Sequence, residues 1–285
     1  MHMRLNATAI ATSVLVASPV GADPAASVVR VGNTSEIRLS YRTEDRGTNS
    51  SGSSSGRNAI LERVVAVTPE GVEYEYDLPD SASEADRKKQ WFFPARVFKP
   101  NSSPAKLLNS LELTTRLDQW LASANWTHEM CGRWVFTWNA FQIVCDPTKV
   151  LDAVEPFDLR ATQPRDGAIL SHPAALASSI IRQIASNDSG ATYVADFAVN
   201  PAVIRKQRAE TDVVVGQISG KAVNLQAALE DHAKKQITGT IRITFETDSA
   251  GDVLRRTTET HLETKVQDGG SETSKRTETV ERVNY

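Results

Sequence analysis

The residues best suited to chemistry in this sequence are its two cysteines, Cys131 and Cys145. They flank a stretch that we expect to fold as a hairpin, with strands at 134–137 and 140–145 and a turn near Trp138. Such a hairpin would set the two cysteines opposite each other, and cysteine pairs in exported proteins usually form disulfides. We therefore predict a Cys131–Cys145 bond. The alternative is a cysteine nucleophile, which needs a histidine and an orienting amide or carboxylate close in space. His128 is near Cys131 in sequence.

Aromatic side chains are concentrated in the same stretch, which holds four of the five tryptophans between residues 120 and 146. They could form a platform for a sugar ring or the lining of an apolar pocket. The alternative is the domain core, because aromatic side chains bury a large area each and make up only 6% of the chain. The pattern favours the core, with any pocket bordered by this stretch. The candidates for its lining are Trp120, Trp126, Trp134, Phe136 and Trp138.

Histidines and carboxylates show no spacing typical of a metal or catalytic site. Glu259, His261 and Glu263 share one face of an expected strand, where they would either bind a cation or lie on a solvated surface; the surface is favoured. Nucleophile elbows, phosphate loops and dinucleotide-binding glycine patterns are missing. We therefore expect no metal, no cofactor and no catalytic residue, and we lean against an enzyme.

The N-terminus has the pattern of a secretory signal peptide over residues 1–22, with Arg4, an apolar run and small residues before Asp23. The remaining residues, 23–285, are expected to form a single α+β domain. Without Arg4 this part has 31 basic and 35 acidic residues, a net charge of −4. It therefore has no basic excess for binding nucleic acid. No later segment is long and apolar enough to cross a membrane. We expect a periplasmic or secreted protein.

Strand patterns gather at both ends of the chain, and helix patterns gather in its middle. Residues 37–44 alternate apolar and polar side chains, as do residues 241–248. This similarity indicates either an internal duplication or convergence on a common strand pattern. The glycine- and serine-rich residues 47–56 predict a flexible loop. Helices are expected at 104–124, 147–154, 173–185, 201–208 and 224–235, and a strand at 212–218.

These elements predict a curved antiparallel sheet built from the N- and C-terminal strand groups and covered on one face by helices from the middle of the chain. In element order the chain resembles the periplasmic lipoprotein carriers, in which helices plug a curved antiparallel sheet. The resemblance rests on element order and gives no residue a role.

Three functions fit this outline. The favoured hypothesis is a non-catalytic cell-envelope protein that binds an apolar small molecule or another envelope protein. The alternative is an extracytoplasmic hydrolase with a site of dispersed Asp, Glu, His or Ser residues. The third is a structural assembly subunit, which would have an exposed apolar patch or an unpaired sheet edge.

Overall fold

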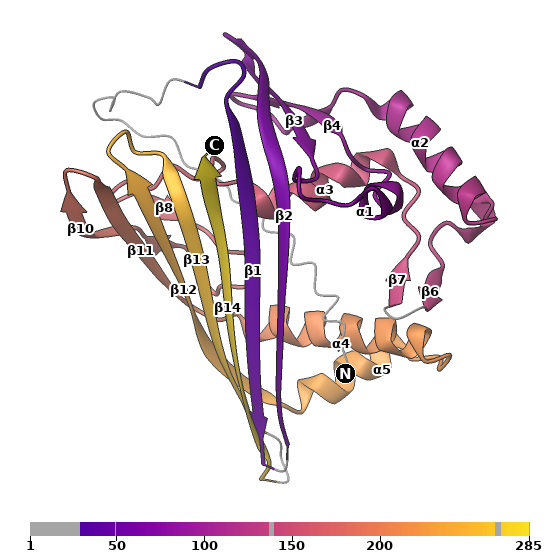
Figure 1. The fold of residues 1–285 in the computed structure, drawn as a ribbon. Coiled ribbons are helices and arrows are strands. Elements are labelled where there is room, and N and C mark those ends of the chain that lie inside the picture. Colours follow the sequence, from indigo (N-terminus) through magenta and orange to yellow (C-terminus); the bar gives the residue numbers. More distant parts are fainter. Residues whose placement is uncertain (1–28, 49, 137–139, 266–268, 285) are drawn as a thin grey trace.

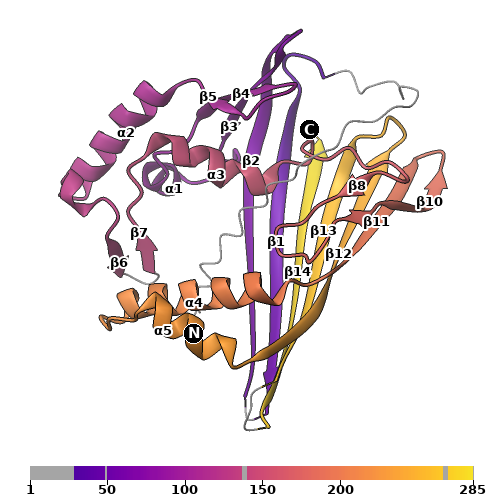
Figure 2. The same cartoon turned by 180° about the vertical axis from the view of Figure 1, so that it is seen from behind.

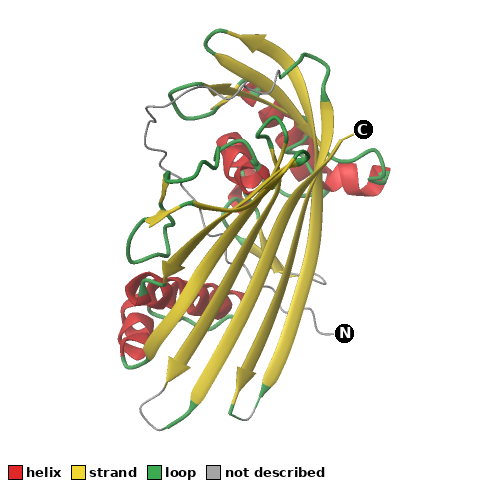
Figure 3. Ribbon diagram, turned by 90° about the vertical axis from the view of Figure 1, so that its left-hand side faces the viewer, coloured by secondary structure: helices red, strands yellow, loops and turns green. Residues whose placement is uncertain are grey.

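A ten-stranded antiparallel sheet dominates the computed structural model, which describes residues 29–48, 50–136, 140–265 and 269–284. Its order is β10-β11-β12-β13-β14-β1-β2-β3-β4-β5, and Figure 3 shows its twist and curvature. The N-terminal strands are β1 (Thr34–Gly47), β2 (Ser51–Thr68), β3 (Gly71–Asp77), β4 (Ala95–Pro100) and β5 (Lys106–Leu107). The later strands are β10 (Arg182–Asn187), β11 (Gly190–Ala198), β12 (Gln236–Asp248), β13 (Val253–Lys265) and β14 (Ser271–Asn284).

The two ends of the chain meet in the middle of this sheet. β1 pairs with β14 from Ser35 opposite Asn284 to Gly47 opposite Glu272, without a register shift. This pairing joins the N-terminal strands to the C-terminal meander β12–β13–β14. An α+β class with a mainly antiparallel sheet was predicted from the sequence and is confirmed.

The helices lie on one side of the sheet (Figures 1 and 2). Near one end of the strands lie α1 (Glu84–Lys89), α2 (Ser110–Ser123) and α3 (Val150–Val154). Further along lie α4 (Pro201–Ile218) and α5 (Leu225–Ala233), which pack against each other. The short 3-10 helices are η1 (His128–Met130), η2 (Pro147–Lys149) and η3 (Glu155–Phe157). Two small hairpins complete the fold: β6 (Trp134–Phe136) with β7 (Ala140–Gln142), and β8 (Ile169–Leu170) with β9 (Ser179–Ile180).

The two faces of the sheet differ in chemistry. Alternate side chains such as Ile37, Ile60 and Ile241 are buried beneath the helical layer, as the strand period of two requires. The opposite face carries threonines and ion pairs, among them Arg242 with Asp196 at 2.7 Å. One face of the sheet is therefore solvent-exposed, as is common for antiparallel sheets.

The expectation of a loop at 47–56 was wrong for most of that stretch. β2 begins at Ser51, and its first residues pair with β1, for example Gly52 with Asp45. Gly56 lies opposite Tyr41, whose ring would come within 2.5 Å of a Cβ atom there. Gly56 therefore leaves room for the Tyr41 ring across the strand pair, as glycine does where another group approaches the backbone closely.

Two local predictions in the middle of the chain were also wrong. Residues 173–178 form turns instead of a helix, and the rest of this stretch forms β9, which pairs with β8, and the start of β10, which pairs with β11. Residues 212–218 continue α4 instead of forming a strand. Gly216 lets Val223 approach the helix, since a Cβ at that glycine would lie 2.5 Å from Val223 Cγ2. Tertiary packing thus overrides the strand propensity of three consecutive valines.

The helix expected at 104–124 begins only at Ser110, because residues 106 and 107 pair with β4 as the strand β5. Several other elements agree with the predictions. Residues 147–154 form η2 and α3, with Pro147 in the first turn. Asn224 caps α5 by accepting hydrogen bonds from the next free amides. The proposed signal peptide, residues 1–22, lies outside the described residues. Among the described helices, none has both the length and the apolar content needed to cross a bilayer.

We expect the packing of α2 to be required for stability. Leu117 is 1% exposed and Leu111, on the same helix, is 81% exposed. Leu117→Ala should lower the free energy of unfolding by about 2–5 kcal/mol, because it leaves a cavity in the core. Leu111→Ala is the matched control and should change it by less than about 0.5 kcal/mol. Urea denaturation of both variants measures the difference, and equal effects would contradict this placement of α2.

Candidate ligand-binding site

A polar cavity of about 430 Å³ opens at the end of the sheet where β1, β2 and β14 lie together. Charged side chains from distant parts of the chain line it: Glu62, Arg160, Asp248, Asp252 and Arg282. Residues 32–35 before and at the start of β1 form another wall. The volume falls within the usual range for small-molecule sites, whereas the lining is more polar than is typical.

Glu62 of β2 is the centre of the charges at this cavity. Its side chain is 4% exposed, and one oxygen accepts a hydrogen bond from Arg160 Nη1. The other accepts a hydrogen bond from the Tyr76 hydroxyl at 3.1 Å. Burial, and then the charge of Glu62, raise the pKa of Tyr76 well above its ordinary value, so this hydroxyl stays a donor. Glu62 therefore has a firm partner for each of its oxygens.

Arg282 of β14 lies near the same carboxylate but makes no hydrogen bond to it. Its Nη2 lies 3.8 Å from Glu62 Oε1, and its side chain is 5% exposed. Among the described residues, its Nε and Nη2 have no hydrogen-bond partner. Burial and the nearby charge of Arg160 lower the pKa of Arg282. The buried guanidinium of Arg282 and the partly buried one of Arg160 thus face one carboxylate, which leaves about one positive charge without a bonded partner.

A second buried ion pair supports the segment that carries Arg160. Lys99 of β4 contacts Asp158 at 2.8 Å, and its ammonium lies 5.0 Å from the centre of the Tyr74 ring. Burial alone would raise the pKa of Asp158, but Lys99 together with the amide and charge of Arg160 outweighs it, and the pKa is lowered. Burial raises the pKa of Tyr74 to about 12. The segment after η3 is therefore held on the sheet by two ion pairs.

Arg256 of β13 attaches the same segment from the other side. Its guanidinium donates to the carbonyl oxygens of Pro156 at 2.7 Å and Asp158 at 3.2 Å. His172 lies nearby, and burial together with Arg256 lowers the pKa of its imidazole. Its Nδ1 accepts a hydrogen bond from the amide of Ala174, which leaves the neutral ring with its proton on Nε2. His172 is thus a neutral side chain with a local structural partner.

The aromatic candidates from the sequence are brought together only in part. Trp120 and Trp126 make an edge-to-face contact at 5.4 Å between ring centres, and Trp126 lies 6.4 Å from Phe141 of β7. Trp134 is directed elsewhere, since its indole donates to Gln217 of α4 at 3.0 Å. Trp138 and the side chain of Phe136 lie outside what the structure describes. Trp120 and Trp126 are partly buried and pack against the core, whereas Phe141 is 38% exposed.

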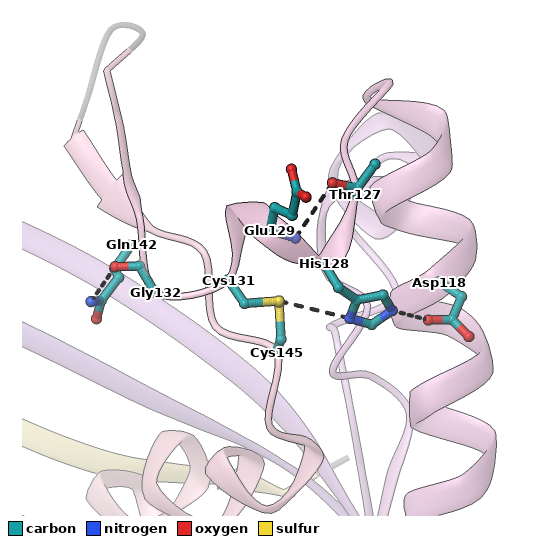
Figure 4. The surroundings of a disulfide bond; sticks show 8 residues. All are labelled: Asp118, Thr127, His128, Glu129, Cys131, Gly132, Gln142 and Cys145. Atoms are coloured by element: carbon teal, nitrogen blue, oxygen red, sulfur yellow. Dashed lines mark hydrogen bonds and ion pairs between the residues drawn. A yellow bond between two sulfur atoms is a disulfide. The ribbon is translucent and has the colours of Figure 1, made fainter.

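The predicted disulfide is present between Cys131 and Cys145, with Cα atoms 5.5 Å apart (Figure 4). His128 lies beside it, with Nδ1 3.8 Å from Cys131 Sγ and Nε2 2.9 Å from Asp118 of α2. An Asp–His–Cys order of this kind could activate a thiol, but both sulfurs are bonded to each other. Among the described residues, the group close enough to hold a metal is His128 with these same cysteines, so the bridge occupies its sulfur ligands.

The charged residues of the cavity were not singled out in the sequence. Glu62 and Arg282 alternate with ordinary strand residues, and their burial depends on pairings between strands far apart in the chain. Arg160 follows an irregular segment with no motif. A signal did exist in Tyr74 and Tyr76, two tyrosines on one strand face, but without the fold it indicated only a sheet surface.

Comparison with known proteins gives little to add. No protein-family model and no curated protein matches the chain. Among solved structures, one described as showing lipid–protein interactions in lipovitellin is similar, with a TM-score of 0.38 and 8% identity. The match covers 89% of this chain and 25% of that chain, so the protein spans about a quarter of lipovitellin. The attachment invasion locus protein Ail of Yersinia pestis gives a TM-score of 0.20 and 6% identity, covering 89% of this chain and 100% of Ail.

We expect Glu62 to be essential for stability because it partly neutralises two buried arginines. Glu62→Gln should lower the free energy of unfolding by about 3–5 kcal/mol, as is usual when one partner of a buried ion pair is removed. Glu75→Gln is the control, since its pair with Arg63 is solvent-accessible and such pairs contribute about 0–1 kcal/mol. Denaturant titration of both variants measures the contrast. A Glu62→Gln effect as small as the control would contradict the buried network.

We also expect the disulfide to stabilise the fold without being central to it. Reduction should lower the free energy of unfolding by about 3 kcal/mol, the chain-entropy value for a loop of about 15 residues. The double variant Cys131→Ser, Cys145→Ser should show no response to reductant. Mass spectrometry after thiol labelling of the unreduced protein should detect no free thiol, and labelling of both cysteines would refute the bridge.

Proposed function

We propose that this chain is a non-catalytic exported cell-envelope protein that binds another envelope protein at the free edge of its sheet. The supporting observation is an apolar surface at that edge, formed by residues 169–187, which we term the edge segment. Four aliphatic side chains of this segment are more than half exposed: Ile169 57%, Leu176 61%, Ile180 58% and Ile184 60%. The disulfide and the signal-like N-terminus support export.

The edge segment has the features of a site for an added strand. All six residues of β10 are exposed, and β10 is the end strand of the ten-stranded sheet (Figure 1). Ile169 and Ile180 are directly opposite each other in the β8–β9 pair, which places two of the apolar side chains side by side. A strand edge supplies backbone donors and acceptors, and neighbouring apolar side chains supply buried area. A partner with an extended apolar segment fits both.

The shape of β10 limits how a partner can pair with it. A bulge between Gln183 and Ala185 interrupts its register with β11. Bulges protect edge strands against unrestricted pairing, so β10 is a poor template for aggregation. Arg182 is held on the outer face by Asp196 at 2.7 Å. The expected contact is therefore short, and its affinity depends mainly on the aliphatic side chains.

Site-specific photocrosslinking in envelope extracts tests this proposal. A photoreactive residue at position 184 should crosslink one defined envelope protein, and Ile180→Asp should lower the yield by roughly tenfold, as for a central apolar contact. A photoreactive residue at position 111 is the matched control, because Leu111 is an exposed leucine on α2, outside the sheet. A product of the chain with itself, or the same products from both positions, would overturn the proposal.

An apolar small molecule is a second candidate, favoured by the neighbouring rings of Trp120, Trp126 and Phe141, of which Phe141 is 38% exposed. Such a ligand would cover these rings and remain bound through mild purification. Native mass spectrometry of protein from its own host distinguishes the two functions, since a retained apolar molecule supports this candidate and not the edge contact. The hydrolase remains a hypothesis from the sequence.

A further inference from the structure

The buried wall of the polar cavity has an unusual imbalance of charge. Arg160 and Arg282 both face Glu62, and only Arg160 is hydrogen-bonded to it. An unpaired buried charge is expensive, whereas a bonded counter-ion recovers much of that cost. The excess is located at Arg282, whose side chain is almost completely buried.

The acidic residues at the rim do not bond to Arg282. Asp248 caps the loop between β12 and β13, and its Oδ1 accepts hydrogen bonds from the amides of Ala250 and Asp252, both at 2.9 Å. Asp252 is close enough to act on Arg282 through space. Among the described residues, however, no ion pair within 4.0 Å joins it to either arginine. The rim is therefore acidic and the deeper wall is basic.

The free atoms of Arg282 define the ligand chemistry. Nε and Nη2 form one edge of the planar guanidinium, and both lack a hydrogen-bond partner. This edge matches the two oxygens of a carboxylate, which binds it through two parallel hydrogen bonds. Arg160 Nε is also without a partner. The acidic rim would repel a doubly charged phosphate more than a singly charged carboxylate, because repulsion grows with charge.

From this geometry we propose that the cavity binds the carboxylate of a small monoanionic molecule, paired side-on with the Nε–Nη2 edge of Arg282. The cavity of about 430 Å³ accommodates the rest of a small molecule. The Nε–Nη2 edge is enclosed in this structure, so the proposed binding requires the guanidinium to turn toward the cavity. This site is independent of the edge segment and of the disulfide hairpin.

Thermal unfolding with simple anions tests the site. The melting temperature of the full chain should be higher in sodium propionate than in sodium chloride at equal ionic strength. Sodium phosphate should raise the melting temperature less than propionate does. Arg282→Met should weaken propionate binding by at least about tenfold, because it removes both hydrogen bonds from a charged group to the carboxylate. Without anion, this variant should be no less stable than the natural protein, because it loses an unpaired charge.

Arg255→Met is the matched control. Arg255 belongs to β13, one residue from the cavity residue Leu254, and its side chain is 45% exposed, in contact with Glu246 and Glu281. It should keep the full response to propionate. Isothermal titration with propionate then gives the affinities directly. The site would be refuted by no response to propionate, by an equal response in Arg282→Met, or by a larger response to phosphate than to propionate.

Discussion

The backbone pairing of β1 with β14 is the constraint on which the rest of the fold depends. It joins residues near the two ends of the chain along the whole length of both strands. Without it the N-terminal strands and the C-terminal meander would be two separate sheets, each with an unpaired edge. With it, the inner faces of both groups form one surface for the helices to cover. The polar cavity also depends on this pairing, because Glu62 and Arg282 come from opposite sides of it.

The buried charges join the layers of the protein to each other. Arg160 and Asp158 belong to the segment after η3, and they contact Glu62 and Lys99 on the sheet. Arg256 holds the same segment from β13. Apolar packing alone would allow this irregular segment several positions, whereas directional bonds to its carbonyl oxygens and side chains select one. As a result, Arg160 and Arg282 share the single carboxylate of Glu62 where the polar cavity opens, and one positive charge is in excess there.

The sequence predicted well the features set by local pattern. The strands at the C-terminal end and the helix at 224–235 follow from periodicity, and the Cys131–Cys145 bridge follows from the expectation of an exported protein. It failed where distant residues decide the outcome. Pairing with β8 and β11 made strands of β9 and β10 where a helix was expected, and Gly56 pairs with Tyr41 in the ladder between β1 and β2 instead of lying in a loop. The charged cavity could not be predicted for the same reason, because Glu62 and Arg282 are 220 positions apart and meet through strand order alone.

The position of the disulfide has a consequence for the order of events during folding. Cys131 and Cys145 are separated by only 14 positions, whereas β1 must wait for β14. Closing a short loop costs little chain entropy and is fast, while a pairing across almost the whole chain is slow. The bridge can therefore form while the sheet is still open. Oxidation would then act early, as a restraint on the unfinished chain that shortens its search for the final topology.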